Sequence, residues 1–192
     1  MGKQATHKGE CQICGRTQKL PGGRMAKHGY TVSWGFFNGT CQGSAALPFE
    51  QDCSLVAEAI RAAKKHRVYL VERIAELREN TNPVRAHAHY YAKDHGYEST
   101  WADTSTIVVA EPGRHSGQWV APVTDPRGGA QVATFGYKGR SYGSATAEEA
   151  AYGANVRLAE GMERNDLASA QRYIDWQTSR LADWTVQPLR TV

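Results

Sequence analysis

Apolar side chains recur at helical intervals between Asp52 and Asn80. Leu55, Ala59 and Ala62 begin a series that steps by three and four residues to the end of this stretch. The spacing predicts one long amphipathic helix, because it brings the apolar side chains onto a single face. Asp52 or Ser54 at its start is a residue type that caps helices through a side-chain oxygen.

Pro83 interrupts this pattern and can open a second helix, with Gly96 as its C-cap. The second helix is expected to run through His87 and His89 to about Asp94. On a helix, two residues that are two positions apart point to different faces. The pattern therefore predicts partly exposed histidines here, and no shared metal site between them.

The region from about 104 to 142 changes to β-type patterning. Short runs of β-branched and aromatic residues alternate with Gly and Pro turn signals, and the runs are 106–109, 118–120 and 131–135. A small antiparallel meander is the expected product.

Helical spacing returns from Ala145 to Trp184, with Ser144 or Thr146 as a suitable cap. The apolar series changes phase near Gly161, where we expect a kink or a break. The two long helices are expected to pack against each other in antiparallel orientation.

The N-terminal region has a different texture. Residues 1–9 resemble a flexible tail, and residues 10–52 are rich in Gly and turn signals around one strand or hairpin at 30–37. So few aliphatic residues cannot hold a module of this size together by burial alone.

All four cysteines of the chain fall at or beside this region: Cys11, Cys14, Cys41 and Cys53. Residues 1–8 lack the apolar run of an export signal. We therefore expect reduced thiols that bind a metal, in preference to disulfides. Cys11-Gln12-Ile13-Cys14-Gly15 has the spacing of a zinc knuckle, which supplies two of the four ligands of a structural zinc ion.

Two sets of ligands can complete this site. The favoured set is Cys11, Cys14, His28 and Cys41, spaced C-x2-C-x13-H-x12-C, and the alternative replaces His28 by Cys53. Either set fills all four positions of one Zn²⁺, which leaves no open position for a catalytic water. The metal is therefore expected to serve the folding of this module.

The predicted fold class is α+β and mainly helical. It consists of an N-terminal zinc ribbon or treble-clef-like module, a long antiparallel helical pair, and a small β meander inserted between the helices. The predicted domains are a tail at 1–9, a zinc-binding module at 10–52, and a helical domain at 53–192 with its β insert at about 104–142.

Positive charge is concentrated at the N-terminus. Residues 1–40 hold six basic residues and one acidic residue, whereas the whole chain has a net charge of +4. Such asymmetry favours an anionic partner. Cations for phosphates and aromatic rings for unpaired bases are what nucleic-acid binding requires. The candidates are Arg16, Lys19, Arg24 and Lys27 as cations, and Tyr30, Trp34, Phe36 and Phe37 as rings.

Several motifs of the chain resemble uncharacterised zinc-ribbon-like proteins of tailed bacteriophages. The matching segments are 11–15, 28–30, 39–44, 48–50 and 176–184. The resemblance implies a phage or prophage origin and favours His28 and Cys41 as ligands. It implies no activity.

We therefore expect a non-enzymatic, phage-type zinc protein that contacts nucleic acid and modulates gene expression. The alternative is a protein-interaction module that docks on a host protein complex and inhibits or redirects it. Self-association through the helical pair, as in a coiled coil, is a further expectation. No stretch approaches the roughly 18 consecutive apolar residues of a membrane helix, so we expect a cytoplasmic protein without a membrane partner.

Overall fold

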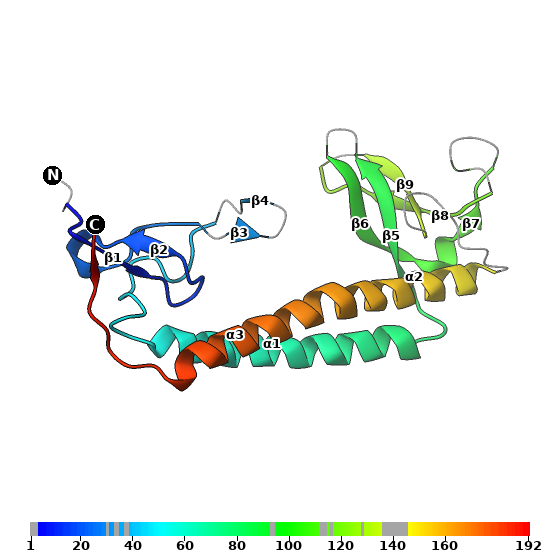
Figure 1. Cartoon of the computed structure of the whole chain (residues 1–192). Coiled ribbons are helices and arrows are strands. Elements are labelled where there is room, and N and C mark those ends of the chain that lie inside the picture. Colours follow the sequence, from blue (N-terminus) through cyan, green and yellow to red (C-terminus); the bar gives the residue numbers. More distant parts are fainter. Residues whose placement is uncertain are drawn as a thin grey trace. The chain divides into compact units, whose positions relative to one another are not determined.

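The structure is a computed structural model of the chain (Figure 1). The contacts between its residues divide the chain into two compact units. Unit 1 comprises residues 1–67 and 169–192, and unit 2 comprises residues 68–168. The structure describes residues 4–29, 31–32, 35–36, 39–92, 95–111, 115, 117–127, 129–135 and 146–192. Both ends of the chain therefore belong to the same unit.

Unit 1 contains two small antiparallel sheets. Strand β1 (His7–Glu10) lies between β2 (Thr17–Lys19) and β10 (Arg190–Thr191), and this pairing brings the two chain ends together (Figure 1). β3 (Thr31–Val32) and β4 (Gly35–Phe36) form the second sheet. The 3₁₀ turn η1, at residues 21–23, follows β2.

The first long helix, α1, extends over Ser54–Glu79 and confirms the helix predicted from Asp52 to Asn80. Asp52 acts at its start as expected, since its carboxylate accepts hydrogen bonds from the backbone N–H and the hydroxyl of Ser54. None of the helices in the described part of the chain combines the length and hydropathy that a membrane span requires.

Unit 2 is built on a five-stranded antiparallel sheet in the order β6-β5-β9-β8-β7. Its strands are β5 (Arg85–Ala92), β6 (Gly96–Asp103), β7 (Val108–Val109), β8 (Trp119–Thr124) and β9 (Ala130–Thr134), and the 3₁₀ turn η2 (Thr104–Thr106) follows β6. β6 and β8 contact each other although two strands separate them in this order, so the sheet is curled. Small buried side chains permit the close approach: Ala86, Ala88, Ala102, Ala121 and Ala133.

One continuous helical stretch follows the sheet. It consists of α2 (Ala147–Gly161), a π-helical turn η4 (Met162–Leu167) and α3 (Ala168–Ala182). Thr146 caps α2 as predicted, because its hydroxyl accepts a hydrogen bond from the N–H of Glu149; Ser144 lies outside the described residues. The π turn begins directly after Gly161 and takes up the predicted change of phase without a break in the helix.

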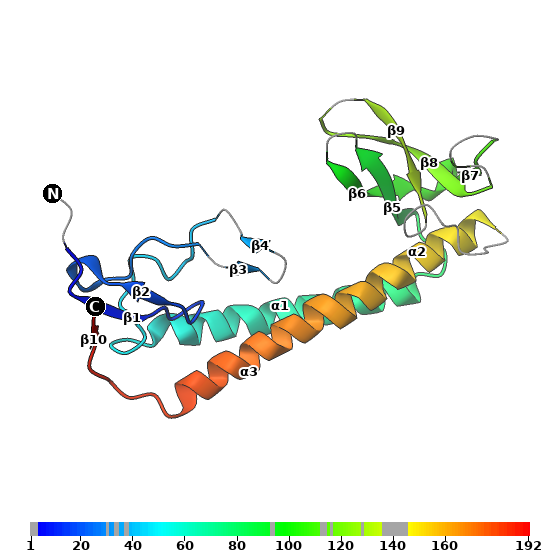
Figure 2. The same cartoon turned by 45° about the horizontal axis from the view of Figure 1, so that its top comes forward.

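The structure contradicts the predicted fold class, because antiparallel sheets organise the described residues. The fold is not mainly helical, and neither a long antiparallel helical pair nor a meander between such helices is seen in the described ranges. Among the described residues, the largest buried cluster joins the five-stranded sheet to α2. Figure 2 shows the sheet next to this helix. The prediction is wrong because spacing by threes and fours shows that a helix has an apolar face but not what covers it. On α1, residues 64–69 are exposed. Self-association stays a prediction.

The predicted second helix at residues 83–94 is also wrong, because Arg85–Ala92 forms β5. Ala86 and Ala88 are buried, whereas the alternate residues His87 and His89 are partly exposed. This is the two-residue period of a strand. Pro83 instead precedes β5, and Gly96 is the first residue of β6, at the inner end of the β-hairpin that these two strands form.

Candidate metal centre

Four side chains of unit 1 come together in a cluster that could bind a metal ion. The ligand atoms of Cys11, Cys14, His28 and Cys41 all lie within 4.8 Å of one another. The Sγ atoms of Cys11 and Cys41 are 3.9 Å apart, and Sγ of Cys14 is 3.5 Å from Nε2 of His28. This is the favoured set from the sequence. Cys53 precedes α1 and is not a member of the cluster.

His28 is oriented by its other ring nitrogen. Nδ1 donates a hydrogen bond to the carbonyl oxygen of Ala26 at 2.8 Å, and a carbonyl can only accept. The proton therefore resides on Nδ1, and the lone pair of Nε2 faces Cys14. This carbonyl support is the usual arrangement behind a metal-bound histidine.

Two turns present the thiols. Backbone N–H groups of Ile13 and Cys14 point at the Cys11 thiol, and the N–H of Gly43 points at that of Cys41. A Cβ atom at Gly43 would collide with Sγ of Cys11. Only glycine therefore fits beside the cluster at position 43.

Burial raises the pKa of Cys11 to about 12 and also raises that of Cys41. Both thiols are therefore protonated at neutral pH without a cation, and a bound metal must displace their protons.

We expect apparent metal affinity to fall by at least about a hundredfold for each pH unit below neutrality, because two or more protons compete with the metal for the thiols. Competition with a chelator at pH 6.5 and 7.5 measures this slope, and a pH-independent affinity would contradict it.

A buried glutamine joins the first turn to α1. Gln12 is 0% exposed, and its Oε1 accepts a hydrogen bond from the N–H of Leu55 at 2.9 Å. Its Nε2 donates to Asp52 and to the carbonyl of Leu47. Gln12 thus satisfies an N–H group at the start of α1 that no helical carbonyl can reach.

Side chains of α3 bind the backbone of the same turn. Nε2 of Gln177 donates to the carbonyls of Gln12 and Ile13, at 3.0 and 3.1 Å. Arg180 donates to the carbonyls of Cys11 and Gln12 and forms a 2.7 Å ion pair with Glu10. The first turn is therefore held by the C-terminal helix, which lies more than 150 residues away in the sequence.

Comparison of the chain with protein-family models, with curated proteins and with solved structures finds no match. The resemblance to phage proteins stays a prediction. The cysteine–histidine cluster and its supporting contacts are thus inferred from the geometry of this chain alone.

The four cations predicted to contact nucleic acid belong to unit 1, as does this cluster. Lys19, Arg24 and Lys27 are exposed, whereas Arg16 is half-buried. Arg24 also donates to the carbonyl of Ala45 at 3.1 Å. Among the predicted stacking rings, Tyr30, Trp34 and Phe37 lie outside the described residues, and Phe36 is part of β4.

Sequence reasoning missed Gln12, Gln177 and Arg180 as parts of the site. By its spacing, Gln177 falls on the apolar face of the helix predicted to end at Trp184. A glutamine at an apolar position of a helix signals a buried hydrogen-bonding role, because a buried amide requires partners. That signal could have marked Gln177, but not the turn that it binds.

Proposed function

We propose that the cluster holds one structural Zn²⁺. A tetrahedral zinc ion with bonds of about 2.3 Å to sulfur and about 2.0–2.1 Å to nitrogen places two sulfurs about 3.8 Å apart, and sulfur and nitrogen about 3.5 Å apart. The observed separations are 3.9 and 3.5 Å. Three thiolates and one imidazole are a common ligand set for structural zinc.

The proposed zinc has a folding role and no catalytic one. Four protein ligands leave no position for water or substrate on a tetrahedral ion. The small buried cluster of this module contains two of the ligands themselves, together with Leu20 and Met25. Metal coordination therefore replaces the apolar core that the module lacks.

We further propose that unit 1 binds nucleic acid through phosphate contacts. Unit 1 carries 13 basic and 6 acidic residues, a net charge of +7, and unit 2 carries 10 basic and 13 acidic residues, a net charge of −3. This segregation of charge is the observation that carries the proposal, because the two units of one chain have net charges of opposite sign. A positive surface of this kind attracts polyanions.

Three of the six acidic residues of unit 1 are engaged inside the unit. Glu10 pairs with Arg180, buried Glu50 accepts hydrogen bonds from the N–H of Glu10 with both oxygens, and Asp52 caps α1. They therefore neutralise little of the exposed positive charge.

Helix α1 adds a second group of cations to those around the cluster. The group is exposed and forms no ion pair among the described residues, and its members are Arg61, Lys64, Lys65 and Arg67. Counted along the helix at 100° per residue, they span about 160° of its circumference. The proposed phosphate-binding residues are thus these four together with Arg16, Lys19, Arg24 and Lys27.

The test is a fluorescence anisotropy titration of the zinc-loaded chain with single- and double-stranded nucleic acid at 50 and 200 mM salt. We expect affinity to fall steeply with salt, because each phosphate contact releases a counterion. Changing Arg24 and Lys27 to alanine should weaken binding at low salt and reduce the salt slope by about two.

The matched control removes two exposed cations of unit 2, Arg78 and Arg164, and should leave binding nearly unchanged. Equal effects of the two double variants would contradict an interface on unit 1. An absence of binding at 50 mM salt would contradict the nucleic-acid proposal as a whole, and docking on a host protein would then be the prediction left to test. Zinc content near one ion per chain is measured on the same sample.

A further inference from the structure

Two histidines of unit 2 lie side by side on β5. His87 and His89 are two positions apart, and a strand directs such residues to the same face. Their ring centroids are 4.8 Å apart, and their ring planes make an angle of 88°. The pair is part of unit 2, whereas the cysteine cluster is part of unit 1.

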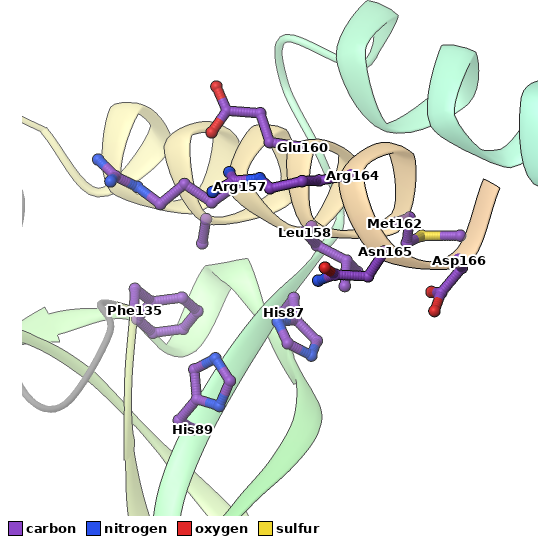
Figure 3. Close-up of a pocket in the computed structure, with 12 residues that line it drawn as sticks. His87, His89, Phe135, Arg157, Leu158, Glu160, Met162, Arg164, Asn165 and Asp166 are labelled. Carbon is purple, nitrogen blue, oxygen red and sulfur yellow. The ribbon is translucent and has the colours of Figure 1, made fainter. Parts of the chain in front are cut away.

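A cavity of about 670 Å³ opens between the two rings and the helical stretch from α2 into the π turn. Figure 3 shows both imidazoles directed from β5 toward this helix, with Asn165 above His87. Asp166 lies on the same side of the helix, and Glu160 is turned away from the histidines. The π turn thus supplies the polar groups that face the pair, and such turns are frequent at functional sites.

Neighbouring side chains fix the pair in place. Asn155 is 1% exposed, accepts a hydrogen bond from the N–H of His87 at 2.9 Å, and donates to the carbonyl of Arg85 at 3.2 Å. Its side-chain amide thus forms hydrogen bonds with the backbone of β5, as a neighbouring strand would. Trp101 contacts the His87 ring from β6 at a centroid distance of 5.7 Å, and Arg73 lies over Trp101.

The separation of the rings fits a single metal ion. Two imidazole nitrogens bonded to one ion at about 2.1 Å and at an angle of about 90–110° hold their ring centroids roughly 4.5–5.3 Å apart. The observed 4.8 Å lies within this interval. Burial also lowers the pKa of His87 to about 4, assisted by His89, and lowers that of His89. Both rings are therefore neutral at pH 7, which is the form that binds metals.

The geometry points to a second metal site at His87 and His89, for a divalent first-row transition ion such as Ni²⁺ or Zn²⁺. Among the described residues, no third His, Cys, Asp or Glu completes a preformed cluster with this pair. The remaining coordination positions are open to water and face the cavity. Unlike the closed cysteine cluster, this site can therefore exchange its ion and accept an oxygen ligand from solution.

The test is an isothermal calorimetric titration of the zinc-loaded full chain with Ni²⁺ at pH 7.5. We expect one further ion per chain with the bound zinc retained. His87→Ala and His89→Ala should each weaken this binding by at least about tenfold, because a single imidazole binds the ion more weakly than two together. His115→Ala, a histidine of unit 2 outside the cavity, should leave it unchanged. Absence of the second ion, or an equal loss in His115→Ala, would overturn the proposal.

Two further measurements distinguish loss of metal binding from misfolding of a variant. His89→Gln keeps a polar side chain at the less buried of the two positions, so it should lose the ion while retaining the wild-type melting temperature. Paramagnetic Ni²⁺ should broaden amide NMR signals around His87 and His89 in the unaltered protein. Broadening confined to other residues would overturn the site.

Discussion

Replacing Cys11 with serine is expected to abolish zinc binding and to unfold the zinc-binding part of unit 1. Cys11 is fully buried, its thiol lies 3.9 Å from that of Cys41, and two backbone N–H groups point at it. Structural zinc contributes about 10–16 kcal/mol of binding free energy in small zinc modules. This equals or exceeds the total stability of a typical domain, about 5–15 kcal/mol. Removal of zinc by a chelator should have the same effect.

The loss should extend to the C-terminal helix but not to the sheet of unit 2. Gln177 and Arg180 bind carbonyls of the turn that contains Cys11, so α3 loses these partners when the turn unfolds. The buried cluster of the five-stranded sheet contains no residue of unit 1. It should therefore stay folded.

Amide hydrogen exchange of the zinc-loaded protein and of Cys11→Ser, read by mass spectrometry, checks this prediction. Protection should disappear from residues 10–45 and from α3 near Gln177, and persist in β5 and β9. Cys53→Ser is the matched control, since Cys53 lies outside the cluster and should retain zinc and protection. If Cys53→Ser released zinc more readily than His28→Ala, the ligand assignment would be wrong.

Replacing Arg180 with alanine should destabilise unit 1 by about 2–4 kcal/mol. The Arg180 side chain is 10% exposed and forms a 2.7 Å ion pair with Glu10. Its guanidinium also lies over two rings, 4.0 Å from the centroid of Phe49 and 4.7 Å from that of Trp176. The variant leaves the Glu10 carboxylate without its cation and Oε1 of the buried Gln177 without the 2.7 Å hydrogen bond from Arg180. This costs more than an exposed pair contributes.

Urea denaturation, followed by the fluorescence of Trp176 and Trp184, measures the change. Arg172→Ala is the matched control on the same helix, because Arg172 is exposed and donates only to Ser169 among the described contacts. It should change stability by no more than about 0.5 kcal/mol. Arg180→Lys keeps the charge but not the planar fork, so we expect an intermediate loss. A loss in Arg180→Ala no greater than in Arg172→Ala would refute the role given to this contact.

The residues of the cysteine–histidine cluster were predictable because the features that define them are local. Two cysteines separated by two residues fit one turn, and the glycine that follows has a φ of +71°. A backbone hydrogen bond brings His28 and Cys41 together: the Cys41 N–H donates to the His28 carbonyl at 2.8 Å. The sequence left Cys53 open as an alternative ligand because ligand spacing does not specify how the chain returns to the metal.

The histidines of β5 show where the sequence was ambiguous. The segment Arg85–Ala92 alternates small and larger side chains, which fits a strand, yet Pro83 and Gly96 also fit helix ends. Its central place in the sheet rests on pairing with β6 and β9, and the latter begins 38 residues after β5 ends. Side-chain direction depends on this choice, so the sequence alone placed His87 and His89 on different faces.

By itself, the sequence predicted the long helix α1, a cap at Ser144 or Thr146, a change of phase near Gly161 and, as the favoured of two sets, the four residues of the cluster. Each depends on residues within a few turns of one another or on the chemistry of a ligand type. Only the tertiary structure decided the sheet order, the absence of a long helical pair in the described residues, and the hold of Gln177 and Arg180 on the first turn. These features join residues up to 170 positions apart. A spacing pattern identifies which face of an element is apolar, but not which distant segment covers it.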